Sequence, residues 1–252
     1  MDGLRETCPM QSMRKKRSRR IAGVLLFGSL TISAVYTFSG FLHASDSLPH
    51  RAPPARVRSD YLLLFIKCIL CMAVMWVPQA VARRWLPIPD RLYTTYYVFL
   101  YCAVFLGNVL DFYHVVPHWD ILLHAFSGAM LCKLGFLLVG QLIGEEHAPV
   151  SANSLLVAVL AFCFALSVGA LWEIYEFVVD RILDLNMQNT HAPDGTAYIG
   201  TAALLDTMGD LIADAIAAVL VAWAGYRAEK KKAPRRMQTV ALNEEETLTF
   251  NQ

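Results

Sequence analysis

Long apolar runs separated by short polar segments dominate the chain. Six runs can be drawn, with approximate bounds 21–43, 61–82, 92–110, 121–143, 154–179 and 203–226. Each is near the ~20 residues that an α-helix needs to cross the hydrocarbon core of a bilayer. Transmembrane barrels show segments of about ten residues with alternating hydrophobicity instead. The pattern therefore predicts an all-α, polytopic transmembrane helix bundle of about six spans.

The polar segments at the two ends of the chain suggest its orientation. A basic block, RKKRSRR at 14–20, precedes the first run, and another, RAEKKK at 227–232, follows the last. Because basic residues are retained on the cytoplasmic side of a membrane, we expect both termini to be cytoplasmic. The predicted parts are a basic tail (1–20), a six-span domain (21–226) and a polar tail (227–252), and both tails have a composition typical of disorder.

The first run and the loop after it leave two points open. Arg51, Arg56 and Arg58 lie in the loop that this topology places outside, and they weaken the predicted orientation without reversing it. Residues 42–44, Leu-His-Ala, resemble a signal-peptidase cleavage site. The apolar region is longer than the ~7–15 residues of a signal peptide, so a retained anchor is favoured over a cleaved signal.

Composition excludes some classes of function. The chain is 56% hydrophobic and only 17% charged, and its formal net charge is +1, so no basic field indicates a nucleic-acid partner. Five of the six cysteines lie in apolar runs, which argues against a disulfide framework. Cys68 and Cys71 form a Cys-x-x-Cys inside a predicted span, where packing is favoured over a redox or metal-binding role.

Acidic and histidine side chains enter three of the runs at spacings that place them on one helix face. They are Asp120 and His124; Glu173, Glu176 and Asp180; and Asp206, Asp210 and Asp214. Because successive spans alternate in direction, all three groups fall at the same end of the bundle, the predicted outer end. Polar helix ends that meet water are one explanation. A charge inside a span is costly and usually faces the bundle interior, so we favour a shared acidic pocket.

Several carboxylates in one dry pocket must share protons, pair with cations or bind a metal ion. Oxygen ligands with one histidine suit Mg²⁺, Mn²⁺ or Zn²⁺. The predicted ligands are Asp120, His124, Glu173, Glu176, Asp206 and Asp210, and the candidate catalytic residues are Glu173, Glu176 and Asp210. Lys67 is an alternative countercharge, although a lysine at this depth also reaches the membrane surface readily.

Two neighbouring features have structural and functional interpretations. Ser127-Gly128 follows His124 by one turn, and small residues there allow helices to approach closely. The loop 188–195, Gln-Asn-Thr-His-Ala-Pro-Asp-Gly, has turn-forming composition. It is either a lid over the pocket or, as we favour, a plain surface loop.

Three blocks carry a resemblance to a known family. HWDILLHAFSG (118–128), ALWEIYEF (170–177) and DTMGDLIAD (206–214) are similar to the YjdF-type bacterial inner-membrane proteins, over approximately residues 60–226. The resemblance implies a multi-pass protein of the bacterial cytoplasmic (inner) membrane. That family is a domain of unknown function, so the resemblance implies no reaction, substrate or catalytic residue.

Three functions remain open on these grounds. The first is a metal-dependent membrane enzyme on a lipid or lipid-linked substrate, with a metal-bound water as nucleophile. The second is a cation- or proton-coupled transporter, although the runs show no inverted repeat. The third is an accessory protein whose polar cluster only joins its helices. Membrane lipid is the one partner expected in every case.

Overall fold

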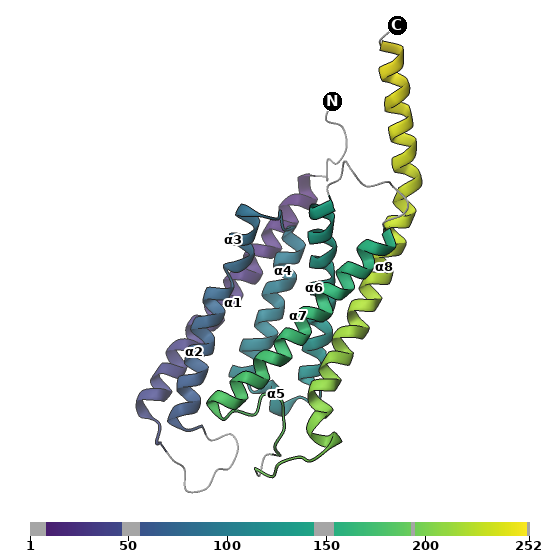
Figure 1. Cartoon of the computed structure of the whole chain (residues 1–252). Helices are drawn as coiled ribbons and strands as arrows, with labels where there is room; N and C mark the ends of the chain where they lie inside the picture. The colour runs from purple at the N-terminus through teal and green to yellow at the C-terminus, as the bar shows by residue number, and fades with distance from the viewer. Residues whose placement is uncertain (1–8, 47–55, 144–153, 193–194, 251–252) are drawn as a thin grey trace. The chain divides into compact units, whose positions relative to one another are not determined.

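The computed structural model describes residues 9–46, 56–143, 154–192 and 195–250, and the chain is helical in nearly all of them (Figure 1). The β-structure within these ranges is a single isolated bridge between His191 and Ala197. Five helical stretches in the described residues are long and apolar enough to cross a membrane: Met13–His43, Arg58–Arg84, Asp90–Val109, Trp119–Leu142 and Ser154–Leu183. The predicted all-α, polytopic membrane fold is confirmed.

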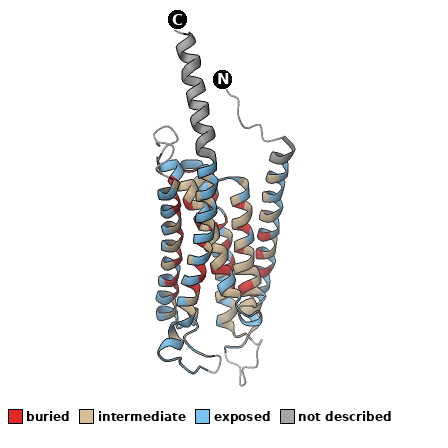
Figure 2. Ribbon diagram, turned by 90° about the vertical axis from the view of Figure 1, so that its right-hand side faces the viewer, coloured by how far each residue is buried: buried red, intermediate tan, exposed pale blue. Residues whose placement is uncertain are grey.

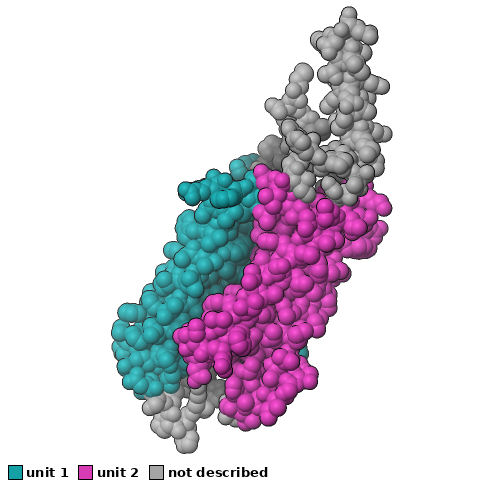
Figure 3. Space-filling model, in the orientation of Figure 1, with its two compact units in different colours: residues 1–119 teal, residues 120–252 magenta. Residues whose placement is uncertain are grey.

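The chain divides into two compact units, residues 1–119 and residues 120–252 (Figure 3). The first unit contains α1 (Pro9–His43), α2 (Arg58–Val74), α3 (Val77–Arg84), α4 (Asp90–Leu100), the π-helix η1 (Tyr101–Val109) and α5 (Phe112–Val115). The second contains α6, which begins at the boundary (Trp119–Ile143), α7 (Ser154–Leu183) and α8 (Thr201–Phe250). The sixth predicted run, 203–226, forms the first half of α8.

The core of the first unit joins α1, α2 and α4. Leu26 and Leu30 of α1 are fully buried, and they belong to the same cluster as Cys68, Cys71 and Tyr97. The two cysteines are free thiols inside this core, in agreement with the packing role expected of them. Aromatic and aliphatic side chains of three helices thus hold this unit together.

The second predicted span is not one continuous helix. α2 ends at Val74 and α3 begins at Val77, with Pro78 in its first turn. Proline lacks a backbone N–H, and the first turn of a helix is where this costs least, because the N–H has no partner within the helix there. Lys67 of α2 donates to Asn108 Oδ1 at 2.6 Å, a bond within the first unit. Lys67, which we considered as a countercharge for the acidic residues, thus donates to the side-chain amide of Asn108 on η1.

Parts of both terminal tails are helical, whereas composition predicted disorder. The basic block 14–20 belongs to α1, where Arg19 pairs with Asp90 at 3.0 Å and lies 3.7 Å from the centre of the Tyr93 ring. α8 continues to Phe250 through the predicted C-terminal tail. The basic block consists of Arg, Lys and Ser, and residues 227–250 are rich in Lys, Arg and Glu. Arg, Lys and Glu are good helix formers.

Small residues line the buried face of α7. Ala158, Ala161, Ala165 and Gly169 recur every three or four residues, and Glu173 and Glu176 continue this stripe. A Cβ atom at Gly135 of α6 would lie 2.9 Å from the Ala161 Cα, so the two backbones nearly touch.

The opposite face of α7 is exposed and apolar; Figure 2 colours the chain by how far each residue is buried. Leu171, Ile174, Phe177 and Val178 are between 45% and 62% exposed, whereas Glu173 on the inner face is 5% exposed. This polarity is the reverse of that expected for a helix on the surface of a water-soluble protein. It is the arrangement expected where lipid surrounds the bundle.

Candidate functional site in the second unit

His124 is the centre of a buried polar cluster between α6, α7 and α8. Its side chain is 5% exposed, and its Nδ1 lies 3.1 Å from Oδ2 of Asp214. Ser127 Oγ donates to the other oxygen of Asp214 at 3.0 Å. An ionised carboxylate only accepts hydrogen bonds, so Nδ1 carries the proton of this bond. In the neutral ring the lone pair is then on Nε2, which lies 3.6 Å from Glu173 Oε1 and 4.0 Å from Asp120 Oδ1.

Two glycines make room for Asp214, which is fully buried. A Cβ at Gly128 of α6 would lie 2.7 Å from the Asp214 carbonyl oxygen, and one at Gly169 of α7 would collide with Asp214 Oδ2. Any larger residue would therefore force α6 or α7 away from α8. The close approach that Ser127-Gly128 suggested is present, and Ser127 also contributes a hydrogen bond.

The carboxylates around His124 are poorly satisfied. Asp210 is 1% exposed, and neither of its oxygens has a hydrogen-bond partner within the described part of the chain. The same holds for one oxygen each of Glu173, Glu176 and Asp206. An unpaired buried carboxylate is costly. Because buried polar groups in proteins are nearly always satisfied, such a group calls for a missing partner.

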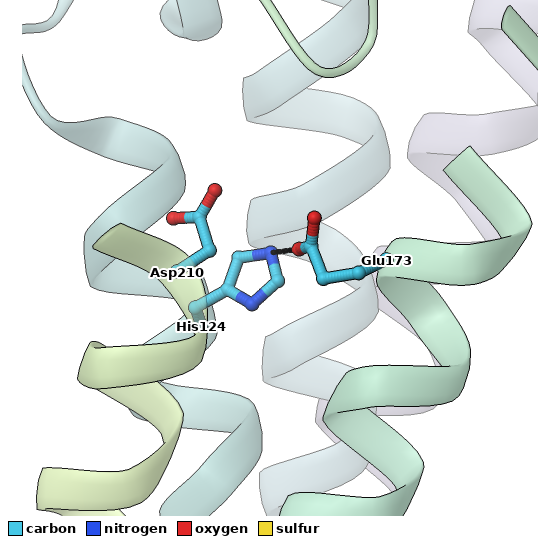
Figure 4. A group of neighbouring side chains, drawn as sticks. All are labelled: His124, Glu173 and Asp210. Carbon is cyan, nitrogen blue, oxygen red and sulfur yellow. Dashed lines mark ion pairs between the residues drawn. The ribbon is translucent and has the colours of Figure 1, made fainter. Parts of the chain in front are cut away.

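Two groups of side chains have the geometry to hold a metal ion. His124, Glu173 and Asp210 form the first, and Asp120, Asp206 and Asp210 form the second. In each group, one ligand atom per residue lies within 4.8 Å of the others. In Figure 4 the His124 ring lies between the carboxylates of Asp210 and Glu173. Three helices thus bring together five of the six predicted ligands.

Glu176 is the predicted ligand that belongs to neither group. It is buried, and its Oε1 accepts from Trp172 Nε1 at 3.1 Å on the same helix, while Oε2 has no hydrogen-bond partner among the described residues. It extends the acidic stripe of α7 one turn beyond Glu173.

The loop after α7 folds back onto the cluster. Asp180 accepts hydrogen bonds from the backbone N–H groups of Met187 (2.8 Å) and Gln188 (3.0 Å). Two residues in the left-handed region, Asp184 (φ 52°) and Asn189 (φ 45°), make the turns, and Asp and Asn tolerate that conformation better than most residues. The Asp180 carboxylate thus accepts from two backbone N–H groups that follow the end of α7.

Gln188 and Asn189 carry this loop to the acidic residues. Gln188 is buried and donates to Thr207 Oγ1 at 2.9 Å and to Glu173 Oε2 at 3.4 Å. Asn189 donates to Asp206 Oδ1 at 2.9 Å. The start of the segment 188–195 is thus part of the cluster and not a plain surface loop. Residues 193–194 of that segment lie outside the described residues.

Three contributors to this cluster are not evident from the sequence pattern. Asp214 was placed on the acidic stripe but not recognised as the partner of His124, from which it is 90 positions distant. Gln188 and Thr207 were not recognised as partners of Glu173 and of each other. Neutral side chains on a loop and at a helix start carry no pattern that predicts such contacts.

Comparisons with known proteins agree on the class of protein. The family model described as "Predicted membrane protein (DUF2238)" matches residues 54–231, which is more than half of the chain. An uncharacterized protein of Thermotoga maritima is 29% identical over 153 residues, which cover 60% of this chain and 69% of the relative. No solved structure matches significantly.

Proposed function

Because the chain belongs to the DUF2238 family of predicted membrane proteins, whose function is unknown, we propose a function from the geometry of its site. The protein is a metal-dependent membrane enzyme that hydrolyses a lipid or lipid-linked substrate. One observation carries this proposal: Nε2 of His124 faces Glu173 while its Nδ1 is held by Asp214, and Asp210 beside it has no hydrogen-bond partner in the described chain.

This arrangement is the one that metal-binding histidines use. Their second ring nitrogen usually donates to a carboxylate, which fixes the tautomer and strengthens the ligand. Here Asp214 is that carboxylate, and Ser127 donates to it in turn. A histidine that served only to join helices would have no need of two further carboxylates with unpaired oxygens beside its free nitrogen.

The ligand set favours a borderline divalent ion and leaves room for chemistry. One imidazole and two carboxylates suit Zn²⁺ or Mn²⁺ better than Ca²⁺, which takes oxygen ligands. Three protein ligands leave a further position open, as in catalytic zinc sites, where bound water has a pKa of about 7. We assign ligation to His124, Glu173 and Asp210, and transfer of the water proton to Glu176, whose Oε2 has no hydrogen-bond partner in the described residues.

The substrate class follows from where the site lies. The ligand Glu173 shares α7 with the exposed apolar side chains of Ile174 and Phe177, so a molecule that reaches the ligands from the surrounding membrane passes apolar surface. A lipid tail suits that surface and a polar head group suits the ligands. The topology inferred from the basic blocks adds that the site opens toward the outer leaflet of a bacterial cytoplasmic membrane.

Metal analysis of the purified full chain tests the proposal. The protein in detergent is stripped with a chelator, supplied in turn with Zn²⁺, Mn²⁺ and Mg²⁺, desalted and measured by mass spectrometry. Wild type is expected to retain metal in stoichiometric amount, and His124→Ala and Glu173→Gln to lose it. Asp184→Asn is the matched control, since Asp184 lies on the same chain segment outside the cluster and Asn tolerates its positive φ.

Thermal unfolding separates loss of ligands from loss of fold: only a variant that unfolds cooperatively is folded, and only its metal content is compared with that of wild type. A folded wild type that retains none of the three metals would refute the enzyme proposal. In that case cation or proton flux through proteoliposomes, abolished by Asp210→Asn, would support the transporter. Neither metal nor flux would favour the accessory protein.

A further inference from the structure

We propose that the site is dinuclear, with Asp210 bridging two divalent ions, and that it acts on a phosphate ester group. The inference rests on the proposed function and specifies its metal content and substrate. Asp210 is the residue shared by the two potential ligand groups. Its two oxygens are both buried and both lack a hydrogen-bond partner in the described chain, so one oxygen is available to each ion.

The spacing of the ligands along their helices matches a pair of ions. Asp120 and His124 are four residues apart on α6, as are Asp206 and Asp210 on α8. Side chains at this spacing are neighbours, with Cβ atoms about 5–6 Å apart. Two-metal sites hold their ions about 3.5–4 Å apart. Each of these helices therefore presents one ligand to the first ion and, one turn earlier, one ligand to the second.

The second position has its own supporting contact. Asp206 Oδ1 accepts a hydrogen bond from Asn189 at 2.9 Å, whereas its Oδ2 is buried and lacks such a partner in the described residues. One oxygen is thus oriented by the loop and the other is available for an ion. The three carboxylates of this group form an all-oxygen set, which suits Mg²⁺ or Mn²⁺. Mn²⁺ fits both positions.

Charge gives an independent reason for two ions. Asp120, Glu173, Asp206 and Asp210, the carboxylates assigned as ligands, carry four formal negative charges when ionised, the same number as the positive charges of two divalent cations; Asp214 and Glu176 are two further buried carboxylates of the cluster. A second divalent ion compensates two more of these charges than one ion does, and so lowers the repulsion of an anionic phosphate group. Paired ions are also suited to phosphoryl chemistry, because they stabilise both the attacking and the leaving oxygen of an in-line displacement.

The reaction is a balanced hydrolysis. The oxygen of a water molecule forms a bond to phosphorus, and the bond from phosphorus to the oxygen of the lipid alcohol breaks. One proton of that water passes to Glu176 and from there to the leaving oxygen, which gives the free alcohol, while the other hydrogen stays on the oxygen now bonded to phosphorus. No oxidant or reductant is needed.

Manganese binding to the full chain tests the number of ions. Chelator-treated protein in detergent is titrated with Mn²⁺ and followed by metal analysis and electron paramagnetic resonance. We expect two Mn²⁺ per wild-type chain with the spectrum of an exchange-coupled pair, and one uncoupled Mn²⁺ in Asp206→Asn. Asn189→Gly, which leaves every ligand in place and tolerates the positive φ of this position, should weaken the second ion about 10–100-fold and the first much less. Asp184→Asn should bind two.

The outcomes separate the two proposals. One Mn²⁺ per wild-type chain, lost in His124→Ala, would overturn the dinuclear site and leave the metal enzyme standing. No bound ion would overturn both. Two ions without exchange coupling, or two ions retained in a folded Asp206→Asn variant, would show that the second position is not the one assigned here.

Phosphate binding tests the substrate class. Inorganic phosphate is added to the Mn²⁺-loaded protein, and so are phosphatidylcholine vesicles with and without phosphatidic acid. A changed spectrum with phosphate in wild type, but not in Asp206→Asn, supports the assignment. Phosphatidic acid acting at lower concentration than inorganic phosphate identifies the lipid as its source, and the reverse order identifies a soluble phosphate. No spectral change with either would overturn the phosphate ester.

Discussion

Replacing Asp214 by Asn separates the orientation of His124 from ligation itself. Asp214 is fully buried, and its two oxygens accept from His124 Nδ1 at 3.1 Å and Ser127 Oγ at 3.0 Å. Asn keeps the shape and one acceptor but removes the charge that favours the Nδ1–H tautomer. Loss of an outer partner of a metal-binding histidine lowers affinity about 10–100-fold, which corresponds to about 1.4–2.7 kcal/mol. Because Asp214 is fully buried and the lost charge is therefore poorly compensated by solvent, we expect the upper end of this range.

The assay is a competition titration of metal against a chelating dye, with wild type and variants in the same detergent. Ser127→Ala is the matched control: it removes one of the two bonds to Asp214 and leaves the carboxylate charge, so its affinity should fall less than about tenfold. An Asp214→Asn variant that melts like wild type and binds metal equally well would refute the argument that Asp214 sets the tautomer. Equal losses in both variants would show that packing, and not charge, is responsible.

Two further predictions concern the frame of the site. Gly169→Ala should lower the free energy of unfolding by about 1–3 kcal/mol, because the new Cβ collides with Asp214 Oδ2. Gly140→Ala is the control: a Cβ there meets nothing within 4 Å, so a thermal melt should show it to be neutral or stabilising. A Gly169→Ala variant with unchanged stability would contradict the close approach of α7 and α8. Asp180→Ala removes the acceptor of two backbone hydrogen bonds, so hydrogen exchange at the Gln188 amide should become at least tenfold faster. A loss of about 1.4 kcal/mol of local stability raises the equilibrium constant for local opening tenfold. An unchanged exchange rate would mean that other contacts hold the loop.

The assembly of the acids was predictable because two regularities combine. Helical spacing places Asp206 and Asp210 on one face of α8, and the alternation of spans brings that face to the same end of the bundle as Glu173 and His124. Neither regularity requires knowledge of side-chain contacts. The helical membrane fold was predictable for a similar reason, since the length and apolarity of each run determine whether it can span a bilayer.

Contacts that depend on packing were not predictable. The hydrogen bond between His124 and Asp214 requires that α6 and α8 approach each other at one register. Gly128 matters for this approach because the backbone of Asp214 lies opposite it, which the sequence does not indicate. The position of Gln188 depends on a loop whose turns are made by Asp184 and Asn189, and turn-forming residues do not indicate which way a loop folds. The break before Pro78 was missed because the apolar run continues through it.

The stripe on α7 shows why packing and chemistry in this unit cannot be altered separately. Its first half, Ala158 to Gly169, is small, and lets α6 and α8 come close enough for Asp214 to reach His124. Its second half carries Glu173, which that same approach places beside His124 Nε2. A larger residue at Gly169 would therefore separate the ligands as well as cost stability. We expect Gly169→Ala to lose metal affinity along with free energy of unfolding, and Gly140→Ala to lose neither.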